Sequence, residues 1–273
     1  MAFYSVVRFR SWPKRYANSE CFEMDGAVLT NAVVVIPARL ASSRFPGKIL
    51  ACETGKYLIQ HVYEQACKAK KIQKVIIAAD DERTMSAAKK FGAPAVMTDP
   101  NLPSGTDRVA AVVREMDVDI VVNVQGDEPR MKPQAIDQLV DLMTDGTPMA
   151  TLATPLESQE EIANPNCVKV VLNKNNDAIY FSRSIIPFPR DGFNAMPPDC
   201  PHLLHLGIYA YRKELLLKLT SLEPSPIEKI EMLEQLRALW NGYRIKVGIT
   251  PYRTQGIDTP EQYKIFVDEF LHR

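Results

Sequence analysis

Short runs of β-branched residues recur through the first half of the chain, and each is followed by polar or charged residues. The runs are Val33–Ile36, Val75–Ile77 and Ile120–Val122. Runs without polar alternation are typical of strands buried on both faces, as in a parallel sheet. Helical patterns alternate with them, near 57–70, 82–91 and 105–116. The sequence therefore predicts an α/β fold built from right-handed βαβ units.

The pattern is less regular after about residue 148. Further strands are predicted at 149–154, 168–172, 178–181, 205–211 and 244–249, and helices at 213–221, 226–240 and from about 260. A proline-rich loop covers 187–201. We interpret this half as an insertion on the same sheet, so that residues 32–273 form a single domain.

Residues 1–31 differ from the rest of the chain. The first sixteen carry four positive charges and no acid, and Glu20, Glu23 and Asp25 follow. The apolar stretch is too short for a secretory signal. Three interpretations remain open: a disordered tail, an Arg-bearing organellar transit peptide, or a true start at Met24.

Composition excludes several classes of protein. Lys plus Arg and Asp plus Glu each number 33, and this zero net charge disfavours a general binder of nucleic acid or membrane surfaces. No apolar run approaches the roughly 20 residues of a membrane span. The five cysteines form no CxxC pair, which disfavours a disulfide framework or a structural zinc site. A reducing, cytoplasmic location follows, with organellar targeting by residues 1–31 left open.

The residues after the three predicted strands point to a charged ligand. They are Pro37–Arg39, Asp80–Asp81 and Gln125–Glu128. Ligands of open α/β sheets bind outside the carboxyl ends of the strands, where these residues are expected to meet. Solvated turns are the alternative interpretation.

A basic loop follows the first strand. Arg39, Arg44 and Lys48 surround Ser42, Ser43 and Gly47. Forked guanidinium donors, a lysine charge and loop N–H groups can together cradle a polyphosphate, although a solvated basic turn has the same composition. The loop is not a Walker A motif, and no GxGxxG is present, which disfavours a dinucleotide-binding oxidoreductase.

This loop and six later motifs together resemble the 3-deoxy-manno-octulosonate (Kdo) cytidylyltransferases, or CMP-Kdo synthetases. The later motifs are Ser104–Arg108, Val122–Pro129, Tyr180–Arg183, His205–Tyr209, Glu231–Arg237 and Gly256–Pro260. The resemblance covers about 32–270. It departs at Ile49, where the family usually has proline, and in the N-terminal extension.

The resemblance implies a Rossmann-like nucleotide-diphospho-sugar transferase fold with a mostly parallel sheet flanked by helices. An inserted region, 175–242, would bind the sugar and form a homodimer. The implied reaction converts CTP and Kdo to CMP-Kdo and diphosphate, for lipopolysaccharide assembly in Gram-negative bacteria or a pectin pathway in plants. Alternatives are the same chemistry on 8-amino-Kdo or another acid sugar, and a non-catalytic nucleotide-binding module.

Nucleotidyl transfer needs a divalent cation, and two aspartates are candidates to hold it. Asp127 follows a buried strand and Gly126, while Asp258 precedes a helix start with Thr259 as N-cap. A turn aspartate and a helix-start acid are the alternatives. The resemblance implies that both hold Mg²⁺, the cofactor, which favours one or two carboxylates plus phosphate oxygens. Glu128 would point away from Asp127.

The residues alone favour a helix cap followed by a surface arginine at Ser104–Arg108. The resemblance implies instead that this loop borders cytosine and ribose, and that Arg39 and Lys48 act in catalysis by neutralising the triphosphate. The expected nucleotide-binding residues are Arg39, Ser43, Arg44, Lys48, Ser104, Thr106 and Arg108.

Kdo is an acid sugar, and the resemblance implies that Arg183 meets its carboxylate. His205 and Tyr209 would face the same side of one strand. In the predicted helix 226–240, Glu234 and Arg237 fall on the apolar arc, which predicts a buried ion pair between them. The expected sugar-binding residues are Gln125, Arg183, His205, Tyr209, Glu234 and Gln235.

Overall fold

We describe the fold from a computed structural model of the chain. The structure describes residues 31–42, 44–144, 146–193, 196–197 and 200–272. The three interpretations of the N-terminal extension concern residues that lie, except for Asn31, outside the described part. Ser43 of the basic loop also lies outside it.

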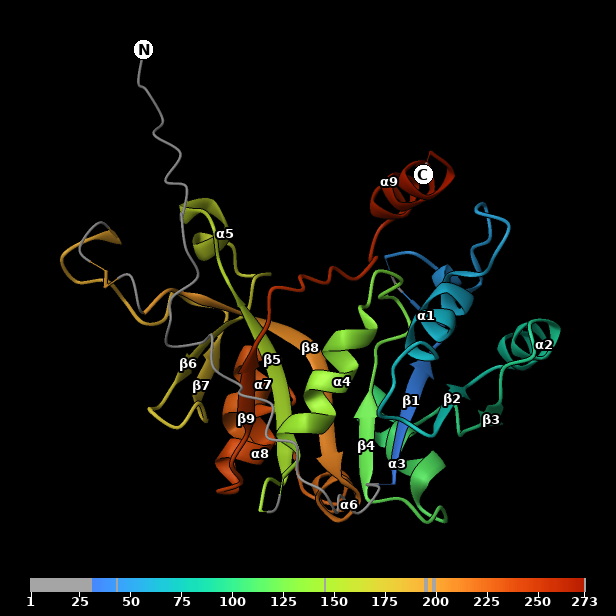
Figure 1. Cartoon of the computed structure of the whole chain (residues 1–273), viewed down its shortest axis with the longest axis horizontal. Helices are drawn as coiled ribbons and strands as arrows, with labels where there is room; N and C mark the ends of the chain where they lie inside the picture. Colours follow the sequence, from blue (N-terminus) through green and yellow to red (C-terminus); the bar gives the residue numbers. More distant parts are fainter. Residues whose placement is uncertain (1–30, 43, 145, 194–195, 198–199, 273) are drawn as a thin grey trace.

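The first half of the chain forms the parallel part of the sheet (Figure 1). Its strands are β1 (Ala32–Ala38), β2 (Lys74–Ala79), β3 (Ala95–Met97) and β4 (Ile120–Asn123), and its helices are α1 (Leu58–Ala66), α2 (Glu82–Lys90) and α3 (Gly105–Val113). β1 pairs in parallel with both β2 and β4, and β2 with β3. The three β-branched runs and the three helices between them are therefore confirmed. Since residues 32–38 are all buried, β1 lies in the centre of the core.

The second half extends the same sheet. β8 (Leu203–Arg212) runs antiparallel between β4 and β5 (Met149–Pro155), and β9 (Lys246–Ile249) pairs in parallel with β5. A hairpin of β6 (Lys169–Leu172) and β7 (Ala178–Ser182) joins through β6 to β8. The nine strands of the described residues belong to one mixed sheet.

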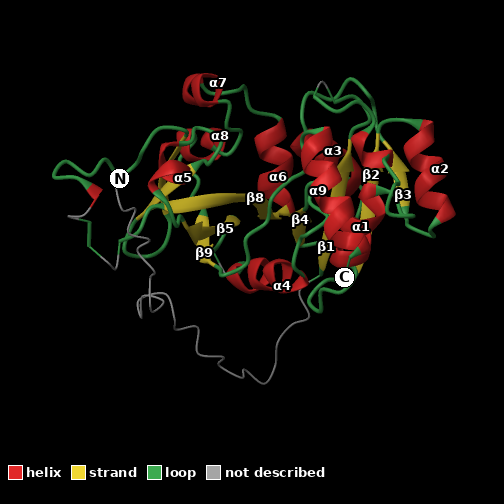
Figure 2. Ribbon diagram, turned by 90° about the horizontal axis from the view of Figure 1, so that it is seen from above, coloured by secondary structure: helices red, strands yellow, loops and turns green. Residues whose placement is uncertain are grey.

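Helices cover both faces of this sheet (Figure 2). Besides α1 to α3 they include α4 (Pro133–Leu142), α5 (Gln159–Ala163), α6 (Lys213–Thr220), α9 (Pro260–Leu271) and a short 3-10 helix, η2 (Lys48–Leu50). Side chains of α1 and α4 pack on one face with Val34 and Ile36, and those of α3 and α6 pack on the other with Val33 and Val35. α9 packs through Tyr263 and Phe266 against Leu58 of α1. No helix in the described part of the chain is long and apolar enough to cross a membrane.

The single helix predicted at 226–240 is wrong. The segment forms α7 (Pro226–Glu231) and α8 (Leu236–Trp240), separated at Met232, which has φ 54°. A capping box of Ser225 and Glu228 begins α7. Ile230 in α7 and Trp240 in α8 are 81% and 57% exposed, so neither lies on a buried apolar face. The residues between the helices line a cavity instead.

Candidate active site

Lys48 lies between the two aspartates that were predicted to hold a cation. Its Nζ is 2.5 Å from Asp127 Oδ2 and 2.9 Å from Asp258 Oδ1, and it donates a hydrogen bond to the Ile257 carbonyl at 2.9 Å. Arg44 Nη2 lies 2.9 Å from the other Asp258 oxygen. The basic loop and both aspartates therefore form one site, which we call the Lys48 cluster.

Backbone contacts hold the three parts of this cluster together. The carbonyl of Asp127 accepts a hydrogen bond from Ile257 N at 2.9 Å. Gly126 lies so close to β1 that an added Cβ would be 2.8 Å from the Pro37 carbonyl oxygen. The predicted N-cap Thr259 is confirmed and forms a capping box with Gln262, which fixes the start of α9 directly after Asp258.

The charges of the cluster fit a divalent cation. Burial alone would lower the pKa of Lys48, but the charges and hydrogen bonds of Asp127 and Asp258 raise it, so the side chain is an ammonium at neutral pH. Both carboxylates are thus aimed at one positive charge. No group of three or more potential metal ligands occurs among the described residues. Two carboxylates, with phosphate oxygens of a nucleotide, are a typical Mg²⁺ ligand set.

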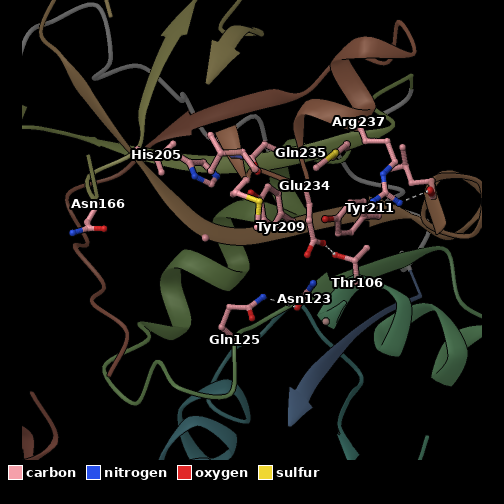
Figure 3. A pocket seen from close by; sticks show the side chains of 17 residues that line it. Thr106, Asn123, Gln125, Asn166, His205, Tyr209, Tyr211, Glu234, Gln235 and Arg237 are labelled. Carbon is pink, nitrogen blue, oxygen red and sulfur yellow. Dashed lines mark hydrogen bonds between the residues drawn. The ribbon is translucent and has the colours of Figure 1, made fainter. Parts of the chain in front are cut away.

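The structure also contains a cavity of about 400 Å³ (Figure 3). Its wall includes Gln125, two residues before Asp127, and side chains from α3, β8 and the segment between α7 and α8. Five expected sugar-binding residues line it: Gln125, His205, Tyr209, Glu234 and Gln235. Polar groups on a partly apolar wall are typical of a small-molecule site.

Arg183 does not lie among the residues that line the cavity. Its Nε donates to the Glu231 carbonyl at 2.8 Å, and its Nη1 donates to the Pro165 carbonyl at 3.1 Å. In this arrangement the guanidinium binds main-chain oxygens, so the expected contact with a sugar carboxylate stays a prediction.

His205 and Tyr209 face the same side of β8, as predicted. Their ring centroids are 5.4 Å apart, and both rings line the cavity. His205 Nε2 lies 3.2 Å from the Thr151 hydroxyl. Burial lowers the pKa of His205 to about 3, so its imidazole is neutral at pH 7 and can both donate and accept a hydrogen bond.

We expect acid to destabilise the protein in part through His205. Because its pKa is lower in the folded protein than the roughly 6.5 of an unfolded chain, the unfolded state takes up the proton first as pH falls below 6.5. At pH 5.5 this preferential protonation of the unfolded state should lower the free energy of unfolding by about 1 kcal/mol. Urea unfolding at pH 7.5 and 5.5 should show a smaller acid loss for His205→Gln than for wild type. Equal losses in the two proteins would contradict the prediction.

The residues of the expected nucleotide loop, Ser104–Arg108, lie in different surroundings. Ser104 caps α3, accepting a hydrogen bond from Asp107 N, and Thr106 points across the cavity to Glu234. The surface arginine is wrong, because Arg108 is 0% exposed and pairs with Asp80 at 3.6 Å. The Arg108 guanidinium donates hydrogen bonds to the Thr98 hydroxyl and to the Asp99 carbonyl, and its expected contact with the nucleotide stays a prediction. Arg39 is exposed beyond β1.

Two expectations about acidic residues have different outcomes. The predicted ion pair of Glu234 and Arg237 is wrong, because Arg237 pairs with Glu228 through contacts of 2.5 and 3.0 Å. Glu128 is buried, and burial together with the charge of Asp127 raises its pKa to about 7. The ion pairs of Lys48 with described residues are those with Asp127 and Asp258, not with Glu128.

Sequence reasoning missed two asparagines in the cavity wall, Asn123 and Asn166. Asn123 is 1% exposed and accepts a hydrogen bond from Gln125 Nε2 at 3.2 Å. It is the last residue of β4, so the rule that ligands bind at strand ends could have found it. Asn166 lies in a loop without a comparable signal.

The chain is similar in fold and sequence to a solved structure described as CMP:2-keto-3-deoxy-manno-octonic acid synthetase complexed with CTP. The TM-score is 0.83 and the identity 41%, and the match covers 89% of this chain and 99% of that one. A cytidylyltransferase from Leptospira borgpetersenii, 18% identical with a TM-score of 0.58, shares the fold. The fold is thus that of the nucleotidyltransferases.

Sequence comparison gives a finer assignment. A cytidylyltransferase family profile matches residues 33–247. The 3-deoxy-manno-octulosonate cytidylyltransferase of Thermodesulfovibrio yellowstonii is 46% identical, over 85% of this chain and 95% of its own length. That of Vibrio campbellii is 50% identical over 84% and 93%. The chain belongs to the 3-deoxy-manno-octulosonate cytidylyltransferase family.

Proposed function

We propose that the protein transfers the cytidylyl group of CTP to Kdo and releases CMP-Kdo and diphosphate. The observation that carries this proposal is the convergence of Lys48, Asp127 and Asp258, together with a cavity that is lined by hydrogen-bonding side chains, among them Gln125, two residues before Asp127. The solved relative that is described as complexed with CTP supports the nucleotide, and the names of the curated relatives support the sugar.

The residues of the chain position the two substrates. Lys48, Arg44 and Arg39 neutralise the triphosphate, and Gln125, His205 and Tyr209 hydrogen-bond the sugar. The 2-hydroxyl oxygen of Kdo forms a bond to the α-phosphorus while the bond from that phosphorus to the departing diphosphate breaks. The hydroxyl proton passes to solvent. Positioning and charge stabilisation supply the catalysis, and no covalent enzyme intermediate is needed.

Mg²⁺ is the proposed cofactor, held by Asp127 and Asp258. When bound, it would screen the triphosphate and lower the pKa of the attacking hydroxyl. Lys48, which already contacts both carboxylates, would hold them in place and remain close to the phosphates.

Diphosphate release tests the function directly. With CTP, Mg²⁺ and Kdo, we expect continuous release, which stops when EDTA removes the metal. Release with 8-amino-Kdo alone would keep the chemistry and change the sugar. No release with either sugar would contradict the proposal and favour a non-catalytic nucleotide-binding module.

We also propose that two copies of the chain associate and that the protein works in the cytoplasm, supplying lipopolysaccharide assembly. Large apolar side chains of the inserted region are exposed, among them Ile179 at 59%, Phe188 at 77% and Ile230 at 81%. Exposed apolar groups concentrated in one region favour an interface.

Light scattering should give twice the chain mass of 30.7 kDa, and a monomer at micromolar concentration would contradict the proposed association of two copies.

A further inference from the structure

The segment 232–235 between α7 and α8 carries two side chains of the cavity wall without belonging to a helix. Glu234 and Gln235 project from it into the cavity, as Figure 3 shows. Met232 within it has φ 54°, a left-handed conformation that a side chain disfavours. Such a segment needs contacts from other elements to keep one conformation.

One set of contacts ties Glu231, the last residue of α7 and the one before this segment, to the end of β7. The Glu231 carboxylate accepts hydrogen bonds from the Ser182 hydroxyl at 2.6 Å and from Arg183 N at 2.9 Å. Arg183 Nε donates to the Glu231 carbonyl at 2.8 Å. These contacts leave the orientation of the Glu234 side chain, three residues further on, undetermined.

A single contact fixes Glu234 itself. The Thr106 hydroxyl donates a hydrogen bond to Glu234 Oε2 at 2.8 Å, the dashed line across the cavity in Figure 3. Within the described residues no other hydrogen bond reaches this carboxylate. Glu234 is exposed to the cavity, so without Thr106 its long side chain would populate several rotamers and lose more entropy when a ligand binds.

We propose that Thr106 is a positioning residue for the acid sugar. It holds the Glu234 carboxylate in the orientation in which that group accepts a hydrogen bond from a sugar hydroxyl. The inference rests on the proposed function and changes the role expected for Thr106, which was contact with the nucleotide. In this role, the start of α3, which was expected to bind the nucleotide, also contributes to the affinity for Kdo.

Steady-state diphosphate release by three variants tests this role. Thr106→Val keeps the shape of the side chain and removes the donor, so the KM for Kdo should rise about tenfold. The KM for CTP should stay within about twofold of wild type, because the proposed contact does not involve the nucleotide. Thr106→Ser, which retains the hydroxyl, should restore the KM for Kdo. Thr144→Val, at an exposed threonine beyond α4, is the matched control.

A double-mutant cycle separates positioning from a general structural effect. In a Glu234→Leu background, which has no acceptor for the Thr106 hydroxyl, Thr106→Val should have little further effect on the KM for Kdo, since both changes remove the same interaction. Effects that multiply, a KM change confined to CTP, or a serine variant as weak as valine would each overturn the inference. If wild type turns over Kdo but the variants give one of these contrary results, only the inference about Thr106 fails and the proposed function stands. If wild type does not turn over Kdo, the inference and the proposed function both fail.

Discussion

Replacement of Asp127 by asparagine should lower kcat for CMP-Kdo formation at least about 100-fold while the protein stays folded. The change removes one of the two carboxylates that face Lys48 and are proposed to hold Mg²⁺. Asparagine keeps the shape and a carbonyl oxygen but not the charge, so it binds a hard divalent cation poorly. Lys48 retains Asp258 as a partner, so the thermal midpoint should change by only a few degrees.

Diphosphate release and thermal unfolding, measured on the same preparation, check both halves of this expectation. Asp268→Asn is the matched control, because Asp268 is an exposed aspartate on α9 and should tolerate the change. Activity close to wild type for Asp127→Asn would contradict the metal assignment. A loss of folding would show instead that the Lys48 cluster is mainly structural.

Replacement of Arg237 by methionine should lower the free energy of unfolding by about 3–5 kcal/mol. Arg237 contacts both carboxylate oxygens of Glu228, whose side chain is 8% exposed, so the variant leaves a buried negative charge without its partner. The same guanidinium also donates to the Leu219 carbonyl at 3.2 Å, which ties α8 to the end of α6. Denaturant unfolding at pH 7.5 measures the loss.

The double variant Glu228→Gln with Arg237→Met separates charge from packing. Glutamine keeps the capping box with Ser225 but carries no charge, so the double variant should recover part of the stability. Arg237→Lys, which keeps the charge without the forked donors, should lie between wild type and methionine. A double variant as unstable as Arg237→Met would show that buried charge is not the cause.

Local signals in the sequence predict much of the sheet. The β-branched runs of β1, β2 and β4 identify strands because buried parallel strands need no polar face. α4 was not predicted, since Pro133 interrupts the pattern although it stands at the first helical position, where proline is tolerated. β3 has only three residues and two of them are exposed, so it has no recognisable period.

The features that were predicted wrongly depend on contacts between distant parts of the chain. The break between α7 and α8 accompanies the bonds of Glu231 to Ser182, 49 residues earlier, which helical periodicity does not contain. The burial of Arg108 depends on Asp80, which the sequence shows only as an acid after a strand. The aspartates of the Lys48 cluster were predicted as a pair only through the family resemblance, because no local pattern connects them.

The Lys48 cluster also bears on biosynthesis. Lys48 and Asp127 are 79 positions apart, but Lys48 and Asp258 are 210 apart. A ribosome adds residues in order and domains begin to fold from their N-terminal side, so the first pair can form long before the second carboxylate has been synthesised. A nascent chain would therefore complete its sheet around a half-built site. Enzymatic activity would begin only when α9 packs against the rest of the domain. The time at which turnover appears during translation would therefore report the last step of folding.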